Sequence, residues 1–269
     1  MNATRLANET KRGQTPLGFS CARRIVSLVP SITETLCEFG MAGRIVGITD
    51  YCIHPARSLR RKARVGGPMN PSLGKILSLK PDLLIAGDEE NRKKDVQALA
   101  RKGIPVYVCR VRGVDDALEM MRVIAAMCPA ASGPQAIIRE TESLYRARPH
   151  GRRRTRVACL VWKNPYMSCG ADTYISRLIE ACGGLNVFHA RRRNYFPLTV
   201  DELARARPQL VLLPTEPYRF RRKDREEILA HLRERGLRGC RARIVEGEMI
   251  AWYGARTRRA LKRLPSILR

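Results

Sequence analysis

Hydrophobic positions change their spacing at Pro30. Residues 25–29 form a short run that is apolar except for Ser27, which is typical of a buried strand. The apolar positions that follow recur at helical spacing, at Ile32, Leu36 and Phe39. We predict a strand, a tight turn and a helix in which Ser31 is the N-cap and Glu34 completes a capping box. The free amides of such a helix can bind a polar or anionic ligand group, although an ordinary βα turn has the same pattern.

Strand and helix patterns alternate through residues 23–112, after a polar, unpatterned lead over residues 1–22 that we expect to be flexible. Short apolar runs predict strands at 44–49, 82–86 and 104–108. Helical spacing predicts helices at 72–79 and 91–102, and turn-rich segments predict loops at 50–55 and 65–71. Strands that alternate with helices indicate a parallel sheet, so we expect an N-terminal α/β lobe.

Residues 113–154 carry a purely helical pattern. The apolar positions from Val114 to Ile124 are spaced for one helix, which Pro129 ends. A second helix is predicted from Ser132 to about Arg148, and its roughly 15 residues would span about 22 Å. We expect this segment to connect two lobes.

The pattern of the first lobe returns over residues 155–269. A strand is predicted at 156–162, a loop at 164–170 and a helix at 173–182. We therefore predict an α/β protein of two Rossmann-like lobes with parallel sheets, joined by a bridging helix. Such lobes place a ligand in the crevice between them, at the carboxyl ends of the strands.

Composition favours a globular chain with a strongly basic surface. The 269 residues are 44% hydrophobic, and 51 Lys and Arg against 25 Asp and Glu give a net charge of +26. This charge implies affinity for polyanions. It is dispersed in short runs without interleaved aromatic residues, however, so we expect no specific nucleic-acid binding. These runs are 60–62, 152–154, 191–193 and 221–223.

The cellular location is predicted from three kinds of sequence signal: membrane spans, a signal peptide and the spacing of cysteines. No run approaches the roughly 18 apolar residues of a membrane span, and the first residues do not form the apolar segment of a signal peptide. The nine cysteines include no C-x-x-C pair, which is typical of free thiols in a reducing compartment. We expect a cytoplasmic protein, or a periplasmic one if the true start lies upstream.

Six motifs in order resemble the periplasmic-type substrate-binding proteins for cobalamin, iron-siderophores and haem, most closely the vitamin B12-binding branch. The motifs lie at 27–34, 46–51, 65–71, 79–83, 182–187 and 252–253. The resemblance covers about residues 23–268. It implies an ABC-type binding protein with a rigid bridging helix and without catalytic residues or a metal site of its own. It also implies a monomer that binds cobalamin or another metal chelate in the cleft between its lobes.

The resemblance also implies which residues contact the ligand. They are Pro30, Ser31, Tyr51, Met69, Asn70, Trp162, Tyr166, Phe196 and Trp252. Aromatic rings suit a wide, flat, mostly apolar macrocycle, because they offer a large contact area and lose little rotamer entropy. A tryptophan at the end of a strand is also often a plain core residue.

Docking onto an ABC permease is predicted to be weak. In transporter-coupled relatives an acidic residue on each lobe docks onto permease arginines. Here the position on the first lobe is Gly74, beside Lys75, while Asp201 and Glu202 remain on the second. We expect this change to weaken docking onto the permease and to leave ligand binding intact.

Three alternatives remain open from the residues. Cys169 near Tyr166 could be the nucleophile of a cytosolic corrinoid- or tetrapyrrole-handling enzyme. Cys52 and His54 could touch a metal centre, or could be a packed thiol and a solvated loop histidine. The acidic run 88–90 could approach polar ligand edges or merely cap a helix. The ligand itself could be an iron-siderophore or haem.

Overall fold

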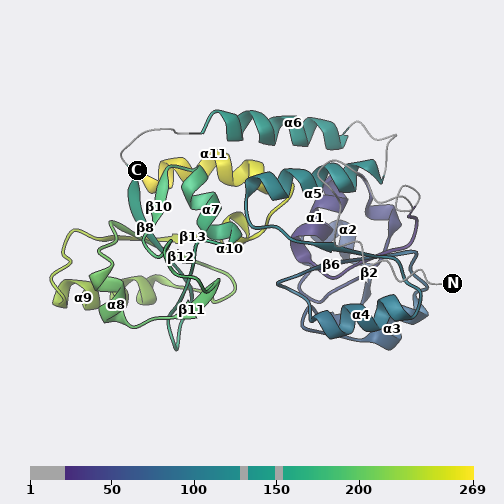
Figure 1. Cartoon of the computed structure of the whole chain (residues 1–269), viewed down its shortest axis with the longest axis horizontal. Coiled ribbons are helices and arrows are strands. Elements are labelled where there is room, and N and C mark those ends of the chain that lie inside the picture. The colour runs from purple at the N-terminus through teal and green to yellow at the C-terminus, as the bar shows by residue number, and fades with distance from the viewer. Residues whose placement is uncertain (1–21, 128–132, 149–153) are drawn as a thin grey trace. The chain divides into compact units, whose positions relative to one another are not determined.

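A computed structural model describes residues 22–127, 133–148 and 154–269 (Figure 1). The chain forms two compact units. The first comprises residues up to Arg110 together with Asp116–Arg139, and the second comprises Val111–Asp115 with Glu140–Arg269. Both are α/β, as the sequence predicted. The predicted domain boundaries at 112/113 and 154/155 stay predictions, and the predicted lead over residues 1–22 lies almost wholly outside the described residues.

The first unit is built on a five-stranded parallel sheet in the order β3-β2-β1-β6-β7. Its strands are β1 (Ile25–Ser27), β2 (Ile45–Ile48), β3 (Ala63–Arg64), β6 (Leu83–Gly87) and β7 (Val106–Cys109). The two-residue strand β3 is exposed and has no apolar run, which is why the pattern missed it. The predicted loop 65–71 contains a small antiparallel pair, β4 (Gly66–Gly67) with β5 (Asn70–Pro71).

Helices cover this sheet on the faces that its alternating side chains define. Val26, Leu84 and Val106 pack with Ile76 of α3 and Leu99 of α4 in one buried cluster. The helices of this part of the chain are α1 (Pro30–Glu38), η1 (Ala42–Arg44), α2 (Ala56–Leu59), α3 (Leu73–Ser78), α4 (Lys93–Arg101), α5 (Val114–Ala126) and α6 (Gly133–Arg146). The two helices predicted over 113–154 are thus present as α5 and α6.

The predicted capping of α1 is wrong. The helix begins at Pro30, with Val29 as N-cap and no side-chain cap. Proline suits the first helical position because its fixed φ is helical and its missing N–H needs no partner. Ser31 and Glu34 therefore lie inside the helix and are buried. The junction is held instead by Thr33, whose hydroxyl lies 2.8 Å from Ser27 Oγ and 3.0 Å from the Val29 carbonyl oxygen.

The second unit has a mixed sheet in the order β11-β9-β8-β12-β13, with β10 also paired to β8. The strands β8, β10, β12 and β13 are parallel, whereas β9 and β11 form an antiparallel edge. Their bounds are β8 Thr155–Trp162, β9 Met167–Cys169, β10 Gly184–Asn186, β11 Tyr195–Pro197, β12 Leu210–Pro214 and β13 Arg241–Val245. The segment predicted as a loop at 164–170 therefore contains a strand, which the sequence hid because it is only three residues long.

Two layers of helices enclose this second sheet. Leu160 and Val211 pack with Leu203 of α8 and Ile228 of α9, and α8 and α9 lie side by side in Figure 1. On α7 and α11, the Tyr174 and Thr257 hydroxyls lie 2.8 Å apart. The helices are α7 (Tyr174–Ala181), α8 (Val200–Arg205), α9 (Arg222–Glu234), α10 (Gly247–Ala251) and α11 (Thr257–Leu268). No helix among the described residues is both long and apolar enough to cross a membrane.

Candidate functional site

Three predicted ligand residues of the first unit lie together on its surface. Tyr51 follows the carboxyl end of β2 with 59% of its side chain exposed, and Met69, in the β4–β5 turn, is 54% exposed. Asn70 is exposed and pairs with Gly67 across this hairpin. A Cβ built on Gly67 would lie 3.8 Å from the Tyr51 ring and only 2.4 Å from Asn70 Oδ1, so glycine permits this close approach. Pro30 is half-buried, and Ser31 is buried.

Polar contacts fix the backbone on either side of Tyr51. The Arg64 guanidinium donates to the carbonyl oxygens of Thr49, at 2.8 Å, and Cys52, at 3.0 Å. The Cys52 thiol is buried, and its Sγ lies 3.1 Å from Thr49 Oγ1. An exposed ring on a fixed backbone is a preorganised contact surface.

Cys52 does not suit a metal ligand. Burial raises the pKa of its thiol, which keeps it protonated. His54 is half-buried in the loop beyond it. Nowhere in the described ranges do three or more His, Cys, Asp or Glu side chains form a cluster that could hold a metal ion.

The turn after β6 supports the β4–β5 hairpin. Asn91 donates from Nδ2 to the Pro68 carbonyl oxygen at 2.9 Å and accepts from the Gly87 amide at 2.9 Å. Sequence reasoning missed Asn91, although an amide side chain after a strand is a common turn signal. In the acidic run, Asp88 is exposed and lies 3.9 Å from Arg110, while Glu89 and Glu90 are half-buried.

The second unit also presents aromatic rings at the carboxyl end of a strand. Trp162 ends β8 with 41% exposure, and its ring meets Tyr218 edge-on at 5.8 Å between centroids. Tyr218 in turn contacts Phe220 at 4.7 Å. Tyr166, half-buried in the β8–β9 turn, lies with its hydroxyl 3.2 Å from Glu227. Burial and the Glu227 carboxylate raise the pKa of Tyr166 to about 12, so the phenol stays neutral.

A lysine ties this turn to α9. Lys163 Nζ lies 2.8 Å from Asp224 and 2.6 Å from Glu227. Asp224 is buried, and burial opposes its ionisation, but the hydrogen bonds from Lys163 and from the Arg221 amide, together with the nearby lysine charges, outweigh that effect and lower its pKa. Sequence reasoning missed this cluster because Lys163 is 61 residues from Asp224 along the chain.

Phe196 and Trp252 are largely covered. Phe196 is 4% exposed and packs edge-on against Phe188 at 5.5 Å. Trp252 is 6% exposed, and the Arg256 guanidinium lies 5.3 Å from its ring centroid. Little of either residue is exposed, and their predicted ligand contacts stay predictions.

Glu216 is a polar group that sequence reasoning did not single out. It follows β12, and its Oε2 atom is buried without a hydrogen-bond partner among the described residues. Burial and the nearby Glu248 raise its pKa, while a hydrogen bond from Trp252 opposes that rise. A Cβ on Gly247 would lie 2.4 Å from the Glu216 amide nitrogen, so a glycine at 247 lets the two segments approach.

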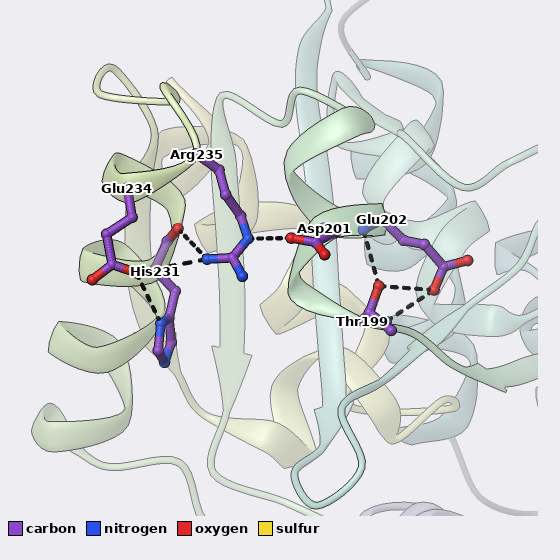
Figure 2. Close-up of polar contacts among 6 residues, drawn as sticks. All are labelled: Thr199, Asp201, Glu202, His231, Glu234 and Arg235. Carbon is purple, nitrogen blue, oxygen red and sulfur yellow. Dashed lines mark hydrogen bonds and ion pairs between the residues drawn. The ribbon is translucent and has the colours of Figure 1, made fainter.

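The two acidic residues predicted to dock a permease are already engaged within the second unit. Figure 2 shows Asp201 paired with Arg235 at the end of α9, and the Arg235 contact lowers the pKa of Asp201. Glu202 accepts from the Thr199 amide at 2.9 Å in a capping box, and lies 2.9 Å from Arg191. Asp201 remains 64% exposed.

The corresponding position on the first unit carries no acid. Gly74 is exposed in the first turn of α3, and a Cβ there would meet nothing within 4 Å. Ser72 caps this helix by accepting from the Lys75 amide. A larger side chain at position 74 would therefore fit without strain.

Cys169 is unsuited to nucleophilic catalysis. It is fully buried, and its Sγ interacts with the neighbouring Cys159 thiol, which lowers the pKa of Cys169 and raises that of Cys159. The buried Cys169 thiol is therefore inaccessible to a substrate.

Comparison with known proteins identifies related sequences. The profile of the family described as periplasmic binding protein matches residues 25–237. The vitamin B12-binding protein of Vibrio cholerae serotype O1 is 24% identical over 193 residues, which cover 71% of this chain and 70% of the relative. The vitamin B12-binding protein of Salmonella choleraesuis is 25% identical over 202 residues, 74% of each chain.

Solved structures share the fold. The periplasmic haem-binding protein RhuT from Roseiflexus sp. RS-1 in apo form has a TM-score of 0.74 and 20% identity. The alignment covers 92% of this chain and 98% of the RhuT chain. The periplasmic vitamin B12-binding protein BtuF of Vibrio cholerae has a TM-score of 0.74 and 19% identity, with 92% and 96% covered. At these identities the likeness shows the fold alone.

Proposed function

Because the chain belongs to the periplasmic binding protein family, we propose that it is a non-enzymatic binding protein for a metal chelate, with cobalamin as the first candidate. The observation that carries the proposal is an exposed aromatic surface at strand carboxyl ends in each unit. Tyr51 with Met69 forms it in the first unit, and Trp162 with Tyr218 forms it in the second.

Exposed rings at these places favour an apolar, flat ligand. A solvent-exposed Trp or Tyr has most of its contact area available for burial, and its two side-chain torsions cost little to order. Tyr51 and Trp162 are the two most exposed aromatic side chains in the described part of the chain. Corrinoid and porphyrin rings are wide enough to use such surfaces, and the relatives named above include binding proteins for both classes of ligand.

The chelate is a ligand in this proposal, not a catalytic cofactor. The one candidate nucleophile, Cys169, is buried, and the polar groups near Trp162 are paired in the Lys163 cluster. These features support binding without catalysis.

Calorimetry with cobalamin, haem and a ferric siderophore tests the proposal. We expect saturable binding of one of them, with tryptophan fluorescence quenched in parallel. Trp162→Ala and Tyr51→Ala should each weaken binding by about 1 kcal/mol or more, as for a lost aromatic contact. Leu77→Ala removes an exposed apolar residue of α3 and should leave affinity unchanged. No heat and no quenching with any of the three up to millimolar concentration would refute the proposal.

A polyanion-binding role is the second candidate, and the net charge of +26 favours it. Counterion release makes such binding collapse between about 50 and 200 mM salt, whereas a stacked macrocycle responds weakly to salt. Titrating the protein with duplex DNA and with cobalamin across this range separates the two roles. Tight DNA binding at the lower salt that collapses at the higher salt, without chelate binding, would favour the polyanion role.

We further propose that any partnership with an ABC permease is weak and that the protein works in a reducing compartment. Gly74 and the pairing of Asp201 with Arg235 support the first proposal. Seven cysteines of the described residues are free, six of them buried, which supports the second.

A further inference from the structure

Three consecutive arginines surround a pocket in the second unit. Arg191, Arg192 and Arg193 line a cavity of about 310 Å³ together with Phe196 and Pro197 of β11. From the sequence alone, these arginines belong to the dispersed basic runs of the surface. Because the three arginines line a pocket, they could instead bind a ligand group.

Close backbone packing holds the arginine segment in place. The Gly170 amide donates to the Asn194 carbonyl oxygen at 2.8 Å. A Cβ on Gly170 would lie 2.3 Å from the Arg193 carbonyl oxygen and 2.7 Å from that of Arg191. Only glycine allows the segment to lie this close to the end of β9, so the three side chains project from a firmly packed backbone.

The pocket carries excess positive charge. Arg191 lies 2.9 Å from Glu202 and its guanidinium is 5.3 Å from the Phe196 ring centroid, so its position is fixed. Within the described ranges, the exposed side chains of Arg192 and Arg193 have no hydrogen-bond or ion-pair partner. Two guanidinium groups are thus available, and their planar forks match carboxylate and phosphate oxygens.

The pocket adjoins the aromatic surface of the same unit. Pro197 of β11 pairs with Met167 of the neighbouring strand β9. Met167 in turn pairs with Trp162 of β8. The Leu198 amide also donates to the Tyr166 carbonyl oxygen at 2.9 Å. Pro197 and Trp162 are thus separated by two strand spacings, about 10 Å. This distance is within the breadth of a macrocycle and its substituents.

We propose that the pocket formed by Arg191, Arg192 and Arg193 binds an anionic substituent of the chelate, a phosphate or a carboxylate, while Trp162 contacts the ring. This inference rests on the proposed function and narrows the ligand to a chelate with such a group. Cobalamin carries a phosphate in its nucleotide loop, and haem carries two propionates. A chelate without an anionic group would use only the aromatic surface.

Matched ligand pairs test this inference. Cobalamin is compared with cobinamide, which lacks the phosphate, and haem with its dimethyl ester, which lacks free carboxylates. The Arg192→Gln/Arg193→Gln double variant should lose about tenfold or more in affinity for the anionic member of a pair and less than twofold for the neutral member. Arg233→Gln/Arg238→Gln removes two exposed arginines at the end of α9 and beyond it, and should change neither.

Each outcome decides between the two proposals. A loss confined to cobalamin assigns the pocket to a phosphate, and a loss confined to haem assigns it to a carboxylate. If the wild type binds a chelate but the double variant binds both members of the pair as well as the wild type does, the anionic site is refuted and the proposed function stands. An equal loss for both members also refutes it. If the wild type binds none of the four compounds, the anionic site is refuted, and the proposed function fails with it if the ferric siderophore does not bind either.

Discussion

At the scale of single residues, the two tryptophans have opposite surroundings. Trp252 is 6% exposed at the end of α10, whereas Trp162 is 41% exposed at the end of β8. We expect Trp252→Ala to lower the free energy of unfolding by about 3 to 5 kcal/mol, because it leaves a cavity. Trp162→Ala should cost less than about 1 kcal/mol. Urea denaturation measures both.

The chelate affinity of the tryptophan variants separates a ligand-binding role from a core role. Trp162→Ala should weaken binding at nearly full stability, while Trp252→Phe, which keeps most of the buried ring but loses the hydrogen bond to Glu216, should retain binding and cost about 1 to 3 kcal/mol in stability. Equal destabilisation by the two alanine variants would show that Trp162 is a core residue, and binding through it would then be wrong.

Which candidate residues lie together was easier to predict than how exposed each of them is. The sequence indicated Tyr51, Met69 and Asn70 together, and the structure brings them together because the β4–β5 hairpin lies beside the end of β2. It could not distinguish Phe196 from Trp162, since burial depends on packing against residues distant in the chain. Glu216 was missed for the same reason: a lone glutamate before a proline carries no pattern.

At the scale of elements, the Lys163 cluster joins the β8–β9 turn to α9. Asp224 is 1% exposed at its side chain, and Lys163 is its cationic partner at 2.8 Å. Lys163→Met should destabilise the protein by about 3 kcal/mol at pH 7, because it leaves a buried carboxylate without its counter-charge. Glu227→Gln is the matched control, since Glu227 is 43% exposed, and should cost much less.

The pH dependence of the same variant gives a second readout. The pKa of Asp224 lies below its ordinary value of 3.8 in the folded protein, so its stabilising contribution is present above that pH and is lost as the pH falls further. Without Lys163, burial is opposed only by the Arg221 amide and the Lys223 charge, so the pKa of Asp224 rises and acid relieves part of the penalty. The stability difference between wild type and Lys163→Met should therefore shrink from pH 7 toward pH 3. A difference that stays constant would show that the Asp224 charge is not responsible.

Elements with continuous apolar runs were predictable, and short polar elements were not. The runs at β6, β8 and β12 identify buried strands because both faces of a parallel strand are covered. Strands β9 and β11 have three residues each and pair antiparallel at the sheet edge, so they carry no comparable run. The start of α1 was misassigned because Ser31 resembles an N-cap, whereas Pro30 itself occupies the first helical position.

At the scale of the whole molecule, the cysteines test the proposed compartment. Of nine cysteines in the sequence, the seven described ones are free, and burial raises the pKa of Cys182 to about 12. Titration of unfolded, never-reduced protein with a thiol reagent should find nine thiols. Native protein should react slowly, because a buried neutral thiol is a poor nucleophile. Seven or fewer thiols in the unfolded protein would indicate a disulfide and contradict the reducing compartment.

Docking onto a permease depends on charge presented by both units. If a family permease presents arginine sites to an acid on each unit, Gly74 removes one contact, and Lys75 and the net charge of +26 add repulsion. Gly74→Glu should therefore bind a cobalamin permease in nanodiscs at least about tenfold more tightly than the wild type. The added side chain has open space, since a Cβ at position 74 meets nothing within 4 Å.

Gly74→Gln separates charge from helix stability. Both variants replace a glycine in α3 and should raise the free energy of unfolding by a similar amount, about 0.5 to 1 kcal/mol. Only Gly74→Glu supplies a carboxylate, so only it should improve docking. Arg235→Ala should add a smaller gain by releasing Asp201 from its ion pair. If the wild type docks as tightly as Gly74→Glu, another acidic residue of the first unit, Glu89 or Glu90, supplies the contact, and position 74 is not the docking site.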